Sequence, residues 1–285
     1  MDIDKNFGNF YFKGKMMAKY HQLKLLAAMV TTASVVCATG IFIYSQYIQK
    51  AYVPESEIGE IAAQYLIKNP ENLLKAGEAL ESQTENSKVD RLIPFAPALL
   101  DTSVTPNYGP DDADVAVIEF FDYLCHYCQQ VAPVVDQAIR EEKGVKYYFK
   151  EYPIFAGSKP VSGQSAATGL LIFDTYNGEA YLKYHNNLMA MTGSYGRTQR
   201  EFTDSDLRDL VVKSGFTSEL TKEQRLKYEQ VISANMQLGE QMGITGTPGF
   251  IVMNRKNPAG ATTTLIPGAT DIGRLKAAIQ KARGI

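Results

Sequence analysis

Cys125 and Cys128 stand in a C-x-x-C spacing shortly after an apolar run, residues 115–121. At this spacing two side chains lie about one turn apart on one face of a helix. If Cys125 caps that helix, free backbone N–H groups and the helix dipole favour its thiolate, and His126 could add positive charge. The pattern predicts a dithiol for disulfide exchange, in which Cys125 attacks and the buried Cys128 resolves the mixed disulfide.

Two other uses of a cysteine pair are weaker. A structural zinc site needs four ligands, but the chain has no second C-x-x-C, and His185 is the only other histidine outside the N-terminal stretch. An inert disulfide across so tight a loop would stabilise little. We therefore expect no metal and no cofactor beyond a redox-active Cys125–Cys128 disulfide.

Glu119 interrupts the apolar run six residues before Cys125. Burial raises the pKa of a carboxyl group unless the group is paired. One interpretation is that Glu119 accepts the proton of Cys128, through water, during exchange. The other is a structural acid that pairs with Lys150 of the neighbouring strand. We favour the first interpretation.

The composition sets broad limits on the protein. With 285 residues, of which 45% are hydrophobic, the chain can build one large core or two smaller ones. The 29 Lys and Arg residues nearly balance the 31 Asp and Glu residues, which gives no reason to expect a nucleic-acid partner. Three cysteines are too few for a disulfide-stapled scaffold.

The N-terminus has a targeting pattern. A lysine-rich segment, residues 1–24, precedes residues 25–47, which carry no charge. A helix of that length, at about 1.5 Å per residue, spans a bilayer core of roughly 30 Å. The lysine excess predicts a cytoplasmic N-terminus and an exported, periplasmic body, where disulfides persist. A signal peptide cleaved near Val36–Ala38 is the alternative, but the apolar residues continue past that point, which favours an anchor.

After a short connector over 48–54, two short helices are expected between the anchor and the main domain. Apolar residues recur at helical spacing from Ile58 to Leu66, and Asn69-Pro70-Glu71 is typical of a second helix start. Their apolar faces need a partner, either the chain's own domain or the same helices of another chain. The polar residues 82–90 are predicted to be a linker.

The main domain alternates strands and helices. Residues 115–121 and 145–152 are predicted strands around a helix that contains Pro133, which makes a parallel β-α-β unit. An edge strand is predicted over 93–100. Residues 159–243 form a helical insertion, and strands over 250–253 and 261–266 precede a last helix over 271–283.

These features resemble the thioredoxin fold and, within it, the bacterial DsbA-like thiol–disulfide oxidoreductases. The resemblance rests on residues 119–128, on Pro133, on Gly246-Thr247-Pro248 before an apolar strand, and on the helical insertion. It implies an α/β thioredoxin domain over 92–285. It also implies that Pro248 is cis and lies beside Cys125, which leaves the Thr247 backbone free to pair with a substrate strand.

A second resemblance concerns the helices before the domain. Residues 58–71 are similar to the oligomerising helices of ScsC-like and Com1-like members, which implies a homo-oligomer formed through 55–86 and isomerase or reductase activity. Tyr127, and threonine before the cis-proline, are closer to isomerases of the DsbC kind.

The combined prediction is a membrane-tethered, extracytoplasmic thiol–disulfide oxidoreductase with isomerase activity. Its partners would be cysteine-containing exported proteins and a membrane redox protein. The alternatives are a monomeric DsbA-type oxidase, a non-catalytic protein-binding scaffold and a glutathione-using transferase.

Overall fold

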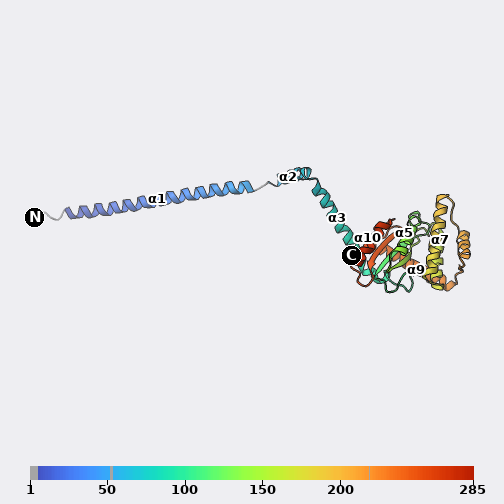
Figure 1. The fold of residues 1–285 in the computed structure, drawn as a ribbon. Helices are drawn as coiled ribbons and strands as arrows, with labels where there is room; N and C mark the ends of the chain where they lie inside the picture. Colours follow the sequence, from blue (N-terminus) through green and yellow to red (C-terminus); the bar gives the residue numbers. More distant parts are fainter. Residues whose placement is uncertain (1–5, 52–53, 218) are drawn as a thin grey trace. The chain divides into compact units, whose positions relative to one another are not determined.

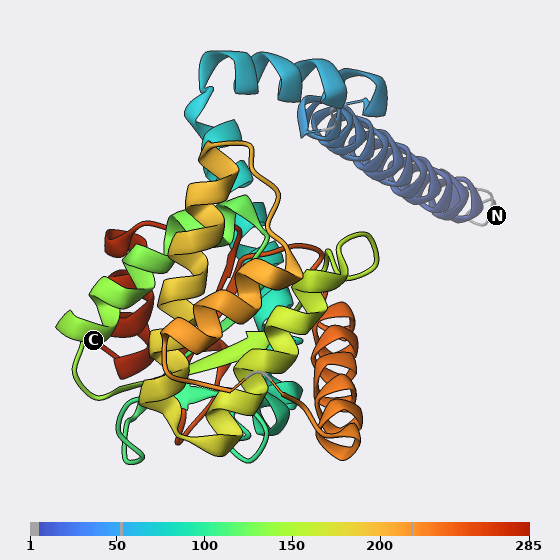
Figure 2. The ribbon, with the colours of Figure 1, turned by 90° about the vertical axis from the view of Figure 1, so that its right-hand side faces the viewer.

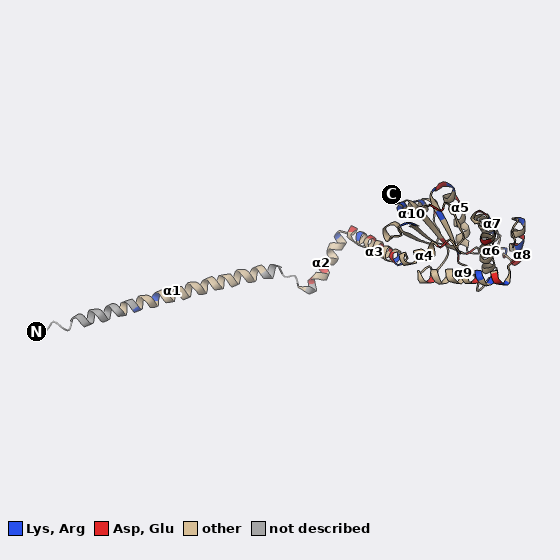
Figure 3. Ribbon diagram, turned by 90° about the horizontal axis from the view of Figure 1, so that it is seen from below, with Lys and Arg blue, Asp and Glu red and all other residues tan. Residues whose placement is uncertain are grey.

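The computed structural model describes residues 6–51, 54–217 and 219–285 and divides into two units, Met1–Gly77 and Glu78–Ile285 (Figure 1). The first unit holds α1 (Asn6–Ala51), α2 (Glu55–Lys68) and the start of α3 (Glu71–Asp90). Within α1, Lys19–Tyr47 is long and apolar enough to cross a membrane, and its run without charges is visible in Figure 3. Residues 1–5 of the basic segment, and residues 52–53 of the predicted connector, lie outside the described residues.

Two predicted boundaries in this region were wrong. α1 continues to Ala51, so most of the connector predicted over 48–54 is helical. α3 continues to Asp90, so residues 82–90 are helix and not linker. Nearly all of these polar side chains are exposed, and Val89 is buried. A polar segment with one buried position is compatible with both a solvent-exposed helix and a linker, so polarity alone does not distinguish the two.

The second unit is built on a five-stranded sheet in the order β1-β3-β2-β4-β5. The strands are β1 (Asn107–Tyr108), β2 (Val115–Phe121), β3 (Val145–Glu151), β4 (Gly249–Asn254) and β5 (Thr264–Pro267). β2 lies at the centre, parallel to β3 and antiparallel to β4. Every residue of β2 and β3 is buried, which explains the nearly continuous apolar sequence of β2, and β3 also buries Lys146, Lys150 and Glu151. The pairing of the two strands confirms the predicted parallel unit.

Three details of the predicted sheet were wrong. Residues 93–100 form a short 3-10 helix, Ile93–Phe95, and α4 (Ala96–Leu99) rather than a strand. The buried residues there, Leu92, Ala96 and Leu99, recur at helical spacing. The edge strand beside β3 is β1, which at two residues is too short to leave a pattern. Only the second half of 261–266 is strand, since Gly260–Thr262 is a 3-10 turn.

The helices of the domain follow the predicted order. α5 (His126–Glu141), which contains Pro133, joins β2 to β3, and α10 (Ile272–Arg283) ends the chain. The insertion consists of α6 (Pro160–Thr175), α7 (Gly178–Arg197), α8 (Asp204–Lys213) and α9 (Lys222–Gln241). Capping boxes begin α8 at Thr203 and α9 at Thr221, so these starts are fixed by local sequence.

The sheet separates two hydrophobic clusters. One face packs against α5, α7 and α10 and includes Phe121, Phe149 and both cysteines of the dithiol. The other packs against α4 and the end of α9 and includes Phe120 and Tyr148. Because side chains alternate along a strand, Glu119 lies on the dithiol face and Lys150 on the opposite face.

Gly239 allows α9 to approach β3 closely. A Cβ atom there would lie 2.5 to 2.8 Å from ring and hydroxyl atoms of Tyr152, whose hydroxyl donates to the Ile244 carbonyl. We expect Gly239→Ala to lower the free energy of unfolding by about 1–3 kcal/mol, measured by urea denaturation. Gly196→Ala, where the added atom makes only an ordinary contact, is the matched control and should be close to neutral. Equal stability of the two variants would contradict this packing.

Candidate active site

Cys125 lies at the N-cap of α5, as predicted, with extended backbone angles of φ −78° and ψ 119°. The turn before it is held by Asp122, which is buried at the end of β2. Its carboxylate accepts from the N–H of Leu124 (2.7 Å), the N–H of Phe155 (2.9 Å) and the hydroxyl of Ser162 (2.8 Å). The sequence analysis missed Asp122, although an acid directly after an apolar strand was the available signal. Asp122 ties the active-site turn to the loop after β3.

The Thr247-Pro248 peptide bond is cis, as the resemblance implied. The Cys125 thiol donates to the Thr247 carbonyl at 3.2 Å, although the two residues are 122 positions apart in sequence. The carbonyl can accept only from the protonated sulfur, so ionisation of Cys125 releases it. The Thr247 hydroxyl is buried and has no hydrogen-bond partner among the described residues.

The two thiols have opposite acidities. The Cys128 side chain, as a hydrogen-bond donor, is the largest influence lowering the pKa of Cys125, to about 6. The Thr247 side chain and the backbone N–H groups of Cys128 and Tyr127 act in the same direction, while burial opposes them. Burial raises the pKa of Cys128 far above its usual range. Cys125 is 5% exposed and Cys128 is fully buried, so only Cys125 is both ionisable and within reach of a partner.

Glu119 lies on the same face of the sheet, and both its carboxyl oxygens are buried without a hydrogen-bond partner among the described residues. Burial raises its pKa to about 8. Its charge also contributes to the raised pKa of Cys128, so the two groups interact. The carboxyl group is therefore protonated at neutral pH and loses its proton close to that range.

The alternative interpretation, in which Glu119 pairs with Lys150, is wrong. In the β2–β3 register Glu119 stands opposite Phe149, and Lys150 stands opposite Phe120. The Lys150 ammonium donates to the Ala98 carbonyl (2.8 Å) and the Thr105 hydroxyl (2.7 Å) on the far side of the sheet. A one-residue offset between paired strands puts side chains on opposite faces, so Lys150 does not support the dithiol directly.

The dipeptide between the cysteines is exposed. Tyr127 is 59% exposed, and the His126 ring packs edge-on to it, with centroids 5.8 Å apart. The Nε2 atom of His126 lies 2.9 Å from the Gln130 amide nitrogen, one turn along α5. Both side chains are thus available to a partner that approaches Cys125.

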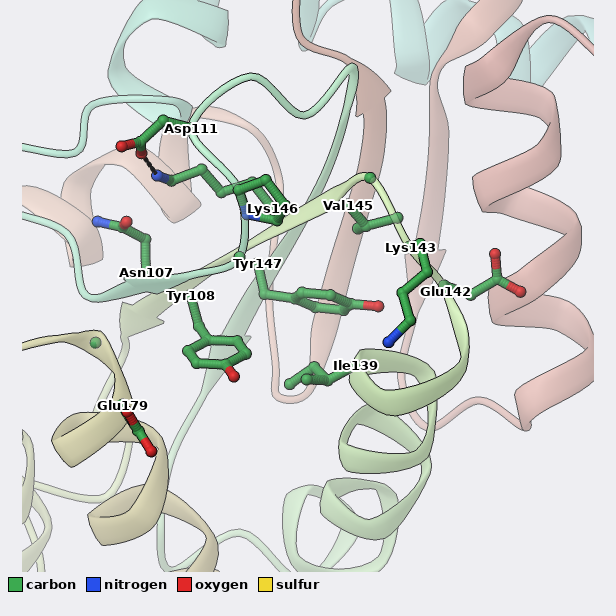
Figure 4. A pocket seen from close by; sticks show the side chains of 14 residues that line it. Asn107, Tyr108, Asp111, Ile139, Glu142, Lys143, Val145, Lys146, Tyr147 and Glu179 are labelled. Carbon is green, nitrogen blue, oxygen red and sulfur yellow. Dashed lines mark hydrogen bonds and ion pairs between the residues drawn. The ribbon is translucent and has the colours of Figure 1, made fainter.

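Two hollows of the domain lie away from the dithiol. One, of about 510 Å³, lies at the far end of α5 and is lined by Tyr108, Ile139 and Tyr147 (Figure 4). Lys146 pairs with Asp111 at its rim. Neither cysteine lines this hollow. No cluster of metal-binding side chains occurs in the described ranges.

Comparison with known proteins identifies this arrangement. The family described as "DSBA-like thioredoxin domain" matches residues 116–280, more than half of the chain. The crystal structure of BcfH from Salmonella enterica Typhimurium is 32% identical, with a TM-score of 0.60, over 85% of this chain and 100% of that one. The chain belongs to the DsbA-like thioredoxin family.

Two further structures share the fold. ScsC from Proteus mirabilis, in a transitional conformation, is 22% identical with a TM-score of 0.57, over 81% of this chain and 98% of its own. The thiol-disulfide exchange protein α-DsbA2 from Wolbachia pipientis is 23% identical with a TM-score of 0.58, over 70% and 97%. No curated protein matches the chain. As a DsbA-like protein, the chain is a thiol–disulfide oxidoreductase that acts on cysteine-containing substrates and redox partners.

A buried carboxyl group that the sequence analysis missed also supports the DsbA-like site. Glu151 ends β3 on the dithiol face, and its Oε1 atom accepts from the hydroxyls of Tyr181 (2.7 Å) and Tyr123 (3.1 Å). Tyr123 lies two residues before Cys125, and its carbonyl accepts from the Gln129 amide at 3.0 Å. Glu151 therefore connects the active-site turn to α7 of the insertion.

The acidity of Cys125 can be tested by thiolate ultraviolet absorbance of the reduced protein. The titration midpoint should lie at about pH 6, and Cys128→Ala should move it towards the ordinary value of 9.0, because the principal hydrogen-bond donor is lost. Cys128→Ser, which retains an O–H donor, should keep most of the shift. An unchanged midpoint in Cys128→Ala would show that Cys128 is not the cause.

The buried acid predicts a pH-dependent stability effect. The native pKa of Glu119 is raised from 4.5 to about 8, so its contribution is fully present below 4.5 and is lost as the pH rises through 8. In the disulfide form, the free energy of unfolding of Glu119→Gln should therefore rise relative to that of the wild type as the pH increases from 4.5 to 8, by roughly 1.4 kcal/mol per pH unit at most. Urea denaturation at both ends of the window measures it, with the exposed Glu229→Gln as control. A pH-independent difference would contradict the assignment.

Proposed function

We propose that this protein is a membrane-tethered, extracytoplasmic disulfide oxidoreductase that also isomerises disulfides and works as a homo-oligomer. The observation that carries the proposal is the asymmetric dithiol, in which an acidic, reachable Cys125 stands beside a buried, weakly acidic Cys128. A thiol with a pKa below the ambient pH is largely thiolate and so is ready to attack a disulfide.

The exchange has two stages. The Cys125 thiolate attacks one sulfur of a substrate disulfide, forms a mixed disulfide and expels the other substrate sulfur as a thiolate. In isomerisation, the expelled thiolate attacks another disulfide of the substrate, and the substrate thiolate freed by that attack then attacks the substrate sulfur of the mixed disulfide, which forms a new substrate disulfide and releases the Cys125 thiolate unchanged. In reduction, Cys128 attacks the Cys125 sulfur, which releases the reduced substrate and leaves the Cys125–Cys128 disulfide. Oxidation of a substrate dithiol is the reverse of this sequence.

Glu119 is proposed as the proton acceptor in the resolving step. Cys128 must lose its proton before it can attack, and its burial makes direct loss to solvent unfavourable. With a pKa of about 8, Glu119 is ionised in a minority of molecules at neutral pH, and in this carboxylate form it can take that proton on the same buried face and return it when the dithiol is re-formed. Water would connect the two groups.

Thr247 is proposed to position the substrate. When Cys125 ionises, the Thr247 carbonyl loses the thiol donor that lies 3.2 Å away. That carbonyl is then free to accept from a backbone N–H of an extended substrate segment, as in β-strand addition. Pro248, His126 and the exposed Tyr127 would border this segment. The same ionisation would thus activate the nucleophile and open the binding position.

The helices before the domain support the proposed oligomer. Most of the large apolar residues of α2 and α3 are more than half exposed within one chain: Ile58, Ile61, Tyr65, Ile67, Leu73, Leu74 and Leu80. Burial against the same helices of other chains would remove this area from water. An oligomer presents several dithiols to one substrate. This favours the isomerisation of proteins that contain several disulfide bonds. The apolar span in α1 would hold the assembly at the membrane.

Refolding of scrambled ribonuclease tests the isomerase proposal. We expect the wild-type protein to restore ribonuclease activity and Cys125→Ser to restore none. The double variant Ile61→Asp/Leu73→Asp should lose about tenfold or more of the isomerase rate, because linked sites raise the effective concentration of a second dithiol. It should still oxidise a reduced peptide at nearly the wild-type rate.

The matched control is Gln64→Asp/Gln83→Asp, which places the same charges at exposed polar positions of the same helices. Light scattering should show that only the apolar double variant dissociates. A monomeric wild-type protein with brisk peptide oxidation and no ribonuclease rescue would favour the DsbA-type oxidase. Two results together would favour a scaffold: the wild-type protein traps no mixed disulfides, and Cys125→Ser binds partners as well as the wild type does.

A further inference from the structure

Lys150 has no place in the dithiol site, yet it is one of the most buried charged side chains of the domain. The residue is 2% exposed. An ammonium group carries three N–H donors, and two of them are used by the Ala98 carbonyl and the Thr105 hydroxyl. Both of these acceptors are neutral, so neither balances the charge. One donor remains without a protein acceptor among the described residues.

The nearby acid does not neutralise this ammonium. Asp101 attracts Lys150 electrostatically, but no ion pair joins them at salt-bridge distance. The Asp101 carboxylate instead accepts from the backbone N–H (2.8 Å) and hydroxyl (2.6 Å) of Ser103. Burial lowers the pKa of Lys150 to about 8, so the group is still charged at neutral pH. A buried charge without a partner is costly, and an anion bound beside it would remove that cost.

A cavity is available for such an anion. Lys150 lines a hollow of about 510 Å³ between α9 and the segment that contains α4. In Figure 2, α9 is the orange helix that stands at the edge of the domain. Its apolar walls include Ala98, Val231 and Leu238, and the amides of Gln230 and Gln237 lie around it. Lys227 also lines the hollow, but it pairs with Asp174 at 2.7 Å.

The shape and chemistry of this cavity select a type of ligand. One available ammonium donor matches a single carboxylate, whereas a phosphate group needs several donors. The apolar walls match an aliphatic body. We propose that the cavity between α9 and residues 96–105 binds an organic carboxylate with a branched or linear aliphatic chain, whose carboxylate pairs with Lys150. A free short-chain acid and the carboxyl terminus of a peptide that ends in an aliphatic residue share this chemistry.

The test uses the full chain in lipid nanodiscs, with empty nanodiscs as the blank. Saturation-transfer NMR titrations measure the binding of 4-methylpentanoate and of its neutral isostere, 4-methylpentanamide. We expect the acid to bind and the amide to bind at least about tenfold more weakly, the effect of losing one charge-assisted hydrogen bond. Lys150→Gln should weaken binding of the acid to the same extent. Equal binding of acid and amide overturns the proposal.

Two surface variants keep the test informative if Lys150→Gln does not fold. Asp101→Asn removes a competing negative charge from the cavity and should tighten binding of the acid several-fold, while Lys183→Gln, outside the cavity, should change nothing. Unaltered binding in Asp101→Asn overturns the proposal. A tetrapeptide ending in leucine, with a free or an amidated C-terminus, separates the two sources. Binding of only the free-acid peptide supports a peptide terminus, binding of only 4-methylpentanoate supports a free acid, and binding of neither overturns it.

Discussion

The contact between the Cys125 sulfur and the Thr247 carbonyl, at 3.2 Å, is the constraint on which the rest of the site depends. It brings together two positions 122 residues apart, and it exists because β2 and β4 are antiparallel neighbours at the centre of one sheet. β2 delivers Cys125 to the start of α5, and the turn before β4 delivers Thr247 to the same edge. The long helical insertion leaves the sheet at β3 and returns at β4, the two strands that flank β2.

The central sheet also sorts the charged groups by face. Glu119 and Glu151 lie on the dithiol side, where burial raises the pKa of both carboxyl groups. Lys150 lies on the other side, away from either acid. This separation keeps a fixed positive charge away from Glu119. A positive charge nearby would lower the pKa of Glu119, and the carboxylate would then be a weak base for the Cys128 proton. The strand register therefore sets the acid–base chemistry available to the dithiol.

The active-site turn is held from three directions. Asp122 ties it to the loop after β3, Glu151 ties Tyr123 to α7, and Gln129 of α5 bonds the Tyr123 carbonyl. These contacts leave little freedom at the N-cap, while the dipeptide His126-Tyr127 remains exposed. A rigid nucleophile bordered by solvent-exposed side chains is a suitable arrangement for exchange with many different protein substrates. Through Glu151 and Tyr123, the same contacts connect α7 of the helical insertion to the active-site turn.

Local sequence determined several features by itself. The C-x-x-C spacing, the apolar run into it, the capping boxes of α8 and α9 and the apolar span of α1 each depend on residues close in the chain, so periodicity and composition were sufficient. The helical nature of 93–100 was missed because two prolines and a short apolar run fit either structure. α3 was cut short because its exposed face resembles a linker.

Tertiary structure alone decided the rest. Whether Lys150 meets Glu119 depends on the register between β2 and β3, and a difference of one residue reverses the face. The acidity of Cys125 depends on how closely Cys128 and Thr247 approach it, and the roles of Asp122 and Glu151 depend on partners 28 to 40 residues away. A sequence lists the groups capable of chemistry, but the distances that set their charge and reach arise only when distant strands pair.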